Sequence, residues 1–207
     1  PRNTAVASVK QSVIPVDKQR KLELFCPLLR RQRWPQVLVF AKTRKRVDEL
    51  VTSLQYQEVS TAAIHGDIPQ HARLAALRRF NAGEVRVLVA TDVAARGIDL
   101  PGLSLVVHVE IPRDAETLQH RSGRTGRAGK KGTAILLVPY PRRRRVEMML
   151  RGARIAAEWV SPPSAAEIRA ADSERMLAQL LAPVETTEED RALAARVLAE
   201  RSAEDIA

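Results

Sequence analysis

VRVLVATDVAARGID, residues 85–99, joins a short apolar run to a polar, irregular loop. An almost wholly apolar run of this length is typical of a strand that is buried on both faces of a sheet. The same alternation of strand and polar loop recurs along the chain. Further strands are expected at QVLVFA (36–41), VSTAAI (59–64), LSLVVHVEI (103–111) and TAILLVP (133–139). We expect 133–139 to be the last strand, and the β-branched stretch 5–16, which contains Pro15, to be an edge strand.

Helical patterns separate these strands. Their start signals are expected at Asp17, Thr43, Pro69 and Asp114, and RRRRVEMMLRGA predicts a further short basic helix. The first helix should run to about Arg31 with a kink or shortening at Pro27, and Leu74 should belong to the apolar face of the third. The sequence therefore predicts an α/β fold, with a parallel sheet covered by helices on both faces. Ligands of such folds bind at loops beyond the carboxyl ends of the strands.

Pro162 and Pro163 interrupt this pattern just after Trp159. We assign residues 1–160 to one domain and residues 161–207 to a linker and a C-terminal helical extension, with helical runs at 164–182 and 187–200. Apolar side chains at Leu193, Val197 and Leu198 need a partner surface, so the tail either docks on the domain or begins an interaction or dimerisation domain. The chain opens without methionine and ends in mid-pattern, and we expect it to be part of a longer protein.

The amino-acid composition limits the classes of molecule that the chain is expected to bind. The net charge of +10 favours a polyanion, nucleic acid first, whereas the aromatic content of 3% makes base stacking on exposed rings a minor contribution. The single cysteine, Cys26, excludes an intrachain disulfide and a zinc site built from cysteines, and we expect no metal site. No apolar run is long enough for a membrane span and no signal-peptide pattern is present, so we expect no membrane contact and a cytoplasmic location.

HRSGRTGRAG, residues 120–129, is the most basic of the expected loops. If its first part is helical, His120, Arg124 and Arg127 share one face, and two guanidiniums one turn apart suit an anionic phosphate. A solvated basic surface is the alternative for an arbitrary pair of arginines, but repeated glycine indicates close approach of backbone or ligand. The chain has no P-loop motif, so these arginines suggest fingers inserted into a site whose other half lies elsewhere.

Four motifs, VLVFAKTR, HGDIPQHAR, VLVATDVAARGID and HRSGRTGRAG, resemble in order and spacing the second RecA-like domain of DEAD-box ATP-dependent RNA helicases. The resemblance covers residues 5 to about 160 and is closest to the bacterial heat-resistant RNA-dependent ATPase and cold-shock groups. It implies half of an RNA-stimulated ATPase, with ATP and Mg²⁺ held mainly by a missing N-terminal RecA-like domain. This chain alone would be inactive. Its partners would be RNA and that domain, with a homodimer through the tail as a further expectation.

The resemblance also implies roles for single residues. Arg124 and Arg127 would reach the γ-phosphate, His120 and Arg121 would tie the motif to the catalytic loops of the other domain, and Asp99 would accept a hydrogen bond from the ribose, with Gly97 beside it. RNA phosphates would be contacted by Thr43, Arg44, Gly66, Asp67, Gln70, Arg73, Thr91, Arg96 and Gly97. Such contacts are insensitive to base sequence and strongly dependent on salt.

Some positions depart from the family pattern or stay open. Leu118 replaces an aromatic residue, Glu110 replaces an aspartate, and Lys42 replaces an asparagine and could add a phosphate contact. Asp67 either orients Arg73 or binds a 2′-hydroxyl. The run 142–145 is either a solvated face or an extension of the RNA path. His71 and His108 are expected to be structural, and His65 is either a turn residue or a functional one. Two other functions stay open, namely a non-enzymatic module that binds RNA or protein, and a related DNA helicase domain.

Overall fold

The computed structural model describes residues 8–31, 34–126, 131–182 and 187–200. The chain divides into two compact units, Pro1–Ser164 and Ala165–Ala207. The first unit contains a seven-stranded sheet in the order β3-β4-β2-β5-β6-β1-β7, in which every neighbouring pair is parallel. Its strands are β1 (Val9–Val16), β2 (Val37–Ala41), β3 (Thr61–Ile64), β4 (Val87–Thr91), β5 (Leu105–His108), β6 (Gly132–Pro139) and β7 (Ala157–Trp159).

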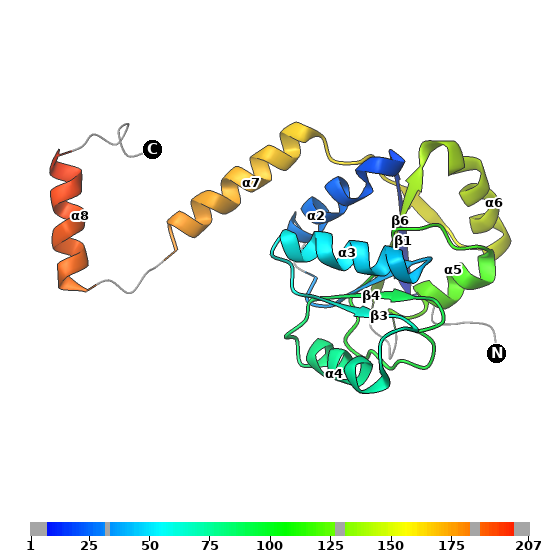
Figure 1. Cartoon of the computed structure of the whole chain (residues 1–207). Coiled ribbons are helices and arrows are strands. Elements are labelled where there is room, and N and C mark those ends of the chain that lie inside the picture. Colours follow the sequence, from blue (N-terminus) through cyan, green and yellow to red (C-terminus); the bar gives the residue numbers. More distant parts are fainter. Residues whose placement is uncertain (1–7, 32–33, 127–130, 183–186, 201–207) are drawn as a thin grey trace. The chain divides into compact units, whose positions relative to one another are not determined.

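Helices connect these strands and cover both faces of the sheet (Figure 1). They are the 3-10 turn η1 (Lys18–Arg20), α2 (Lys21–Arg31), α3 (Arg44–Tyr56), α4 (Gln70–Asn81), α5 (Ala115–Ser122), the 3-10 turn η2 (Tyr140–Arg142) and α6 (Arg143–Ala153). The predicted α/β fold with a parallel sheet covered on both faces is confirmed.

Alternation along the central strands assigns the two faces. In β2, Val37 and Val39 pack in one apolar cluster with α2 and α3, whereas Leu38 and Phe40 pack in another that includes Phe80 of α4. A third cluster joins β6 and β1 to α5 and α6. β2, β4 and β5 are buried along almost their whole length, and they are apolar except for Thr91 and His108 at the ends of β4 and β5.

Local signals fix several helix boundaries. The Thr43 hydroxyl accepts a hydrogen bond from the backbone N–H of Arg46 at 3.2 Å, and an Asp114 carboxylate oxygen accepts one from the N–H of Thr117 at 2.7 Å, so both predicted caps are present. Asp17 precedes η1 rather than an α-helix and makes no side-chain capping bond. Pro27 lies inside α2, which nevertheless continues to Arg31.

Two strand predictions were wrong. The first strand is not at an edge, because β1 lies between β6 and β7, and β6 is not the last strand, because β7 follows α6. Pro15 is tolerated in β1 because β7 pairs only with Gln11–Val13, so the position that lacks an N–H lies beyond that pairing. Leu74, expected on the apolar face of α4, is 47% exposed.

The second unit contains α7 (Ala165–Leu180) and α8 (Glu188–Glu200). Several of its large apolar side chains are exposed, including Met176, Leu177, Leu180, Leu193 and Val197. Leu198 lies among the residues whose side chains are not described. Within the described ranges, none of the helices has the length and apolar character that crossing a membrane requires.

Candidate functional site at the carboxyl edge of the sheet

The register of the central strands brings their ends together. Ala41 lies opposite Thr91 in the β2–β4 pair, and Phe40 lies opposite His108 in the β2–β5 pair. The loops that follow β2, β4 and β5 therefore leave the sheet at one edge, as expected for ligand sites in parallel sheets.

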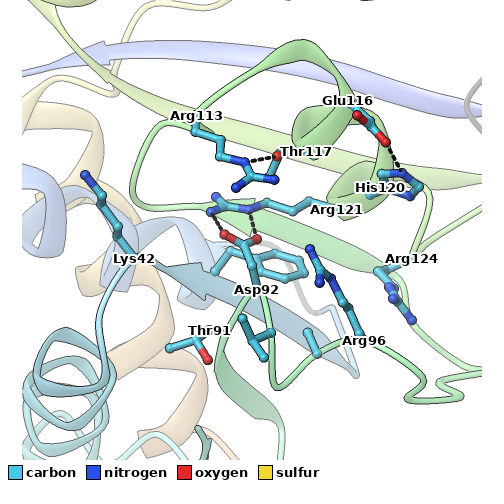
Figure 2. A pocket seen from close by; sticks show the side chains of 13 residues that line it. Lys42, Thr91, Asp92, Arg96, Arg113, Glu116, Thr117, His120, Arg121 and Arg124 are labelled. Carbon is cyan, nitrogen blue, oxygen red and sulfur yellow. Dashed lines mark hydrogen bonds and ion pairs between the residues drawn. The ribbon is translucent and has the colours of Figure 1, made fainter. Parts of the chain in front are cut away.

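A cavity of about 500 Å³ opens at this edge (Figure 2). Its polar and charged lining residues are Lys42, Thr91, Asp92, Arg96, Arg113, Glu116, Thr117, His120, Arg121 and Arg124. In Figure 2, Lys42 lies on one side of the Asp92–Arg121 pair, and Arg96 and Arg124 lie on the other. Cationic side chains from four segments of the chain thus surround one hollow.

Arg121 is held inside its own domain. Its Nε and Nη2 atoms donate to the two carboxylate oxygens of Asp92 at 2.5 and 2.7 Å, and its Nη1 atom donates to the Glu110 carbonyl at 2.9 Å. The guanidinium also lies 5.0 Å from the centre of the Phe40 ring, and the residue is 3% exposed. These contacts hold Arg121 against the loop after β4. The contact with another domain that the family resemblance implies stays a prediction.

Arg124 lies beyond the helix that precedes it. α5 ends at Ser122, and the N–H of Arg124 donates to the Arg121 carbonyl in a turn. The expected helical face shared by His120 and Arg124 is therefore wrong. Instead, Nη1 of Arg124 donates to the carbonyl of Ile98 at 3.0 Å, which fixes this arginine beside Asp99. Arg127, the second predicted finger, lies outside the described residues.

Three glycines shape the backbone around this arginine. Gly126 has a φ of +70° and Gly97 a φ of +71°, values that side chains disfavour. A Cβ atom on Gly132 would lie 2.5 Å from the backbone nitrogen of Gly126 and 2.5 Å from Oγ1 of Thr125. Gly126 of the motif thus lies in a tight turn that is packed against the start of β6.

The other predicted nucleotide residues are exposed. His120 points its Nε2 atom at a carboxylate oxygen of Glu116, 3.4 Å away and one turn earlier on α5 (Figure 2). Asp99 is exposed but does not line the cavity. Both side chains are available to a ligand or to another domain.

The predicted RNA residues form two neighbouring groups. In the first, Arg44 makes a hydrogen-bonded ion pair with Asp67 across the loops after β2 and β3, close to exposed Thr43 and Gly66. Asp67 therefore orients Arg44, and its expected pairing with Arg73 is not observed.

The second group joins α4 to the loop after β4. Arg73 donates to the side-chain oxygen of Gln70 at 3.2 Å and to the Ala94 carbonyl at 3.3 Å. Thr91 and Arg96 line the cavity at the other side of the same loop. The loop 92–97 therefore connects the predicted RNA residues with the predicted nucleotide residues.

Two buried histidines support the loops. His65 is 6% exposed; its Nδ1 atom accepts the N–H of Asp67, so its Nε2–H donates to Asp48 at 3.0 Å. His108 is fully buried against Phe40, with Nε2 3.2 Å from the Ser122 hydroxyl. Burial, with a smaller contribution from Arg121, holds the pKa of His108 well below its usual value, so this imidazole is neutral.

Sequence reasoning missed several residues of the cavity. Arg113 and Thr117 line it and share a hydrogen bond of 3.3 Å from the arginine Nε atom to the threonine hydroxyl. The position of Arg113 just after β5, at a strand end, was the available signal.

Lys42 lines the cavity too, and its backbone N–H donates to the Glu110 carboxylate, so two departures from the family pattern contact each other.

Comparisons with known proteins show which family this chain belongs to. Residues 20–129 match the family model for the helicase conserved C-terminal domain. A DEAD-box ATP-dependent RNA helicase CshA from Geobacillus kaustophilus is 36% identical over 185 residues, which cover 89% of this chain and 40% of that protein. The chain therefore spans well under half the length of this curated relative.

This chain is also similar to solved structures of DEAD-box proteins. The E. coli DEAD-box protein SrmB, bound to regulator of ribonuclease activity A, has 36% identity and a TM-score of 0.67, covering 77% of this chain and 93% of that one. S. cerevisiae Dbp5, bound to RNA and ADP BeF3, has 26% identity and a TM-score of 0.70, covering 84% and 44%.

Proposed function

Because the chain belongs to the helicase conserved C-terminal domain family, we propose that it is the second RecA-like domain of an ATP-dependent RNA helicase, active only together with an N-terminal RecA-like domain. In this proposal ATP binds between the two domains, and RNA binds to both. The Dbp5 structure that resembles this chain holds RNA and ADP BeF3, which supports both ligands. The proposal includes a cytoplasmic location.

The observation that carries the proposal is the cationic cavity. Lys42, Arg96 and Arg124 line it, whereas the Asp92 carboxylate in its wall is already neutralised by Arg121. A hollow with this excess of cations fits the phosphates of a nucleotide. Among the described residues there is no cluster of three His, Cys, Asp or Glu side chains, and we assign Mg²⁺ and most of the nucleotide to the N-terminal domain.

ATP would supply a γ-phosphoryl group whose negative charge must be stabilised during transfer to water. We assign Arg124 to that charge, with Arg127 as its partner and with Asp99 and Gly97 at the ribose. Arg121 keeps the loop after β4 in position, and exposed His120 contacts the other domain. This division makes Arg121 a positioning residue and Arg124 a catalytic one.

RNA binding is assigned to the loops beside the cavity, namely to Thr43, Arg44, Gly66, Asp67, Gln70, Arg73, Thr91, Arg96 and Gly97. Hydroxyl, amide, guanidinium and backbone N–H donors suit phosphate oxygens and do not read bases. We therefore expect binding that is insensitive to base sequence and that weakens steeply with salt.

An arginine finger is the sharpest test. In the full-length protein, Arg124→Ala should lower RNA-stimulated ATP turnover by about 10³-fold or more, because transition-state charge loses its partner, while RNA affinity stays within about two-fold. Arg78→Ala, an exposed arginine on α4, is the matched control and should leave turnover unchanged. Normal turnover in Arg124→Ala would refute the assignment. ATP hydrolysis by residues 1–207 alone would refute the need for the second domain.

We further propose that the second unit forms a homodimer through its exposed apolar side chains, including Leu177, Leu180 and Leu193. Light scattering on residues 1–207 should give the mass of a dimer that dissociates on dilution, whereas residues 1–164 should give a monomer. A monomeric mass for the longer chain at every concentration would exclude the dimer.

A further inference from the structure

A second cationic surface lies at the same edge of the sheet, outside the cavity. It comprises Tyr140 and the four consecutive arginines 142–145, and we call it the α6 basic surface. All five side chains are exposed. It begins where β6 ends, and β6 is two strands away from β2, or about 10 Å at the usual strand spacing.

The arginines of this surface are not equally engaged. Arg143 pairs with Glu147 at 2.9 Å and lies 4.7 Å from the centre of the Trp159 ring, and Arg145 donates to the Arg113 carbonyl at 3.2 Å. Arg142 and Arg144 make no ion pair with any described residue. Two of the four arginines therefore shape the surface, and two present their charge to solvent.

The local charge balance is positive. The turn that contains Lys18 and Arg20 begins beside this surface, because Val16 lies opposite Pro139 at the end of the β1–β6 pair. Positive side chains in this region outnumber negative ones. The positive ones are Lys18, Arg20, Arg113 and the four arginines of the run, and the negative ones are Asp17, Glu23, Asp114 and Glu147. The first turn of α6 contains no acidic residue, so the positive end of the helix dipole adds to this excess.

Tyr140 adds an aromatic ring to the charges. It is 53% exposed and stands between Pro139 and Pro141, whose fixed φ angles restrict the backbone on both sides. A restricted backbone lowers the conformational entropy that is lost when a base stacks on the ring. In a chain with an aromatic content of 3%, Tyr140 beside Arg142 and Arg144 is a combination typical of proteins that bind single-stranded nucleic acid.

We propose that the α6 basic surface is a second contact for single-stranded RNA, separate from the loops after β2, β3 and β4. Arg142 and Arg144 bind backbone phosphates, and Tyr140 stacks on a base. The choice of RNA as the polyanion rests on the proposed function. A protein partner fits less well, because the centres of protein interfaces are apolar and poor in charge, whereas Met148 is the one large apolar side chain of the described part of α6 that is exposed.

The test measures binding of a fluorescently labelled oligoadenylate to residues 1–207 by anisotropy over a salt series, without nucleotide. Arg142→Ala combined with Arg144→Ala should make the slope of log affinity against log salt shallower by about 1.4, the value for two phosphate contacts on a single strand. Tyr140→Ala should lower affinity about five-fold or more, and Tyr140→Phe should retain it, because the ring is kept. Equal melting temperatures would show that each variant is folded.

The matched control combines Arg151→Ala with Arg78→Ala, which removes the same charge at the opposite end of α6 and on α4. Equal losses in the two double variants, or unchanged RNA affinity in the α6 variants, would overturn the proposal. Arg73→Ala, measured alongside, reports on the proposed RNA loops. A loss in Arg73→Ala alone would support the proposed RNA loops and refute the second contact. A loss in the Arg142/Arg144 and Tyr140→Ala variants alone would support the second contact and refute the assignment of RNA binding to the loops.

Discussion

Arg121 brings a full positive charge into a site where it is 3% exposed, and Asp92 neutralises that charge through two hydrogen bonds. Asp92→Asn keeps the shape of the side chain but leaves the guanidinium without an anion. We expect the free energy of unfolding to fall by about 2–4 kcal/mol, somewhat less than for a fully buried pair, because a third of Asp92 contacts water. Urea denaturation of residues 1–207 measures the change.

Asp67→Asn is the matched control for this prediction. It removes the same charge from the pair with Arg44, whose side chains are both about 60% exposed. An exposed pair contributes about 1 kcal/mol or less, so this variant should unfold almost like the wild type. Similar losses in the two variants would mean that burial does not strengthen the Arg121–Asp92 pair.

Lys21 makes stability depend on alkaline pH. Burial lowers its pKa to about 8, partly offset by Glu110, and its ammonium donates to the Val109 carbonyl. Below pH 8 the folded and unfolded states both hold this proton. Between about pH 8 and 10.4 the unfolded chain holds it more tightly, so stability from this group rises with pH, by at most about 3 kcal/mol.

The comparison of the wild type with Lys21→Met isolates this effect. The free energy of unfolding of the wild type minus that of the variant should increase from about pH 7 to about pH 10. A difference that is constant over this range would show that the folded-state pKa of Lys21 is close to that of the unfolded chain.

At the level of elements, Gly132 decides how closely β6 approaches the turn that carries Arg124. An added Cβ would meet the backbone of Gly126 at 2.5 Å, so Gly132→Ala must displace the turn. We expect a loss of about 1–3 kcal/mol in the free energy of unfolding, together with reduced ATP turnover in the full-length protein. Gly152→Ala in α6 is the control, because its nearest new neighbour lies at 3.9 Å. Wild-type stability in Gly132→Ala would show that the turn yields freely.

The elements differ in how far sequence patterns could predict them. β2 and β4 are continuous apolar runs, so their existence and burial follow from composition. β7 is only the three residues Ala157–Trp159, too short for any periodicity, and it exists because β1 offers it an edge. The central position of β1 likewise depends on pairing with β6 and β7, which local preferences do not encode.

The site was predictable where it follows directly from strand ends. Polar residues after β2, β3 and β4 lie on one edge because parallel strands carry their ends there. The pairing of Arg121 with Asp92 was not predictable, because it joins two motifs across the fold. The position of Arg124 beyond the end of α5 was not predictable either. The arginines have the same spacing in the sequence whether the helix ends at Ser122 or continues past Gly123.

For the molecule as a whole, the first unit has its own three apolar clusters. We therefore expect residues 1–164 to unfold within about 2 °C of the melting temperature of residues 1–207, as measured by circular dichroism. A fall of more than about 4 °C, which corresponds to roughly 1 kcal/mol or more, would show that residues 165–207 stabilise the first unit.

The pairing of β1 with β6 also governs the order of events during synthesis. Val9 lies opposite Gly132, and Gln11 lies opposite Ala157, so within this unit β1 is synthesised well before the two strands that pair with it. At elongation rates of about 5–20 residues per second this delay is on the order of ten seconds, far longer than a hairpin needs to form. Throughout that interval the strand that contains Val13 and Ile14 has no partner strand to pair with. The nascent chain therefore carries an unpaired, aggregation-prone strand until translation of the domain is nearly complete.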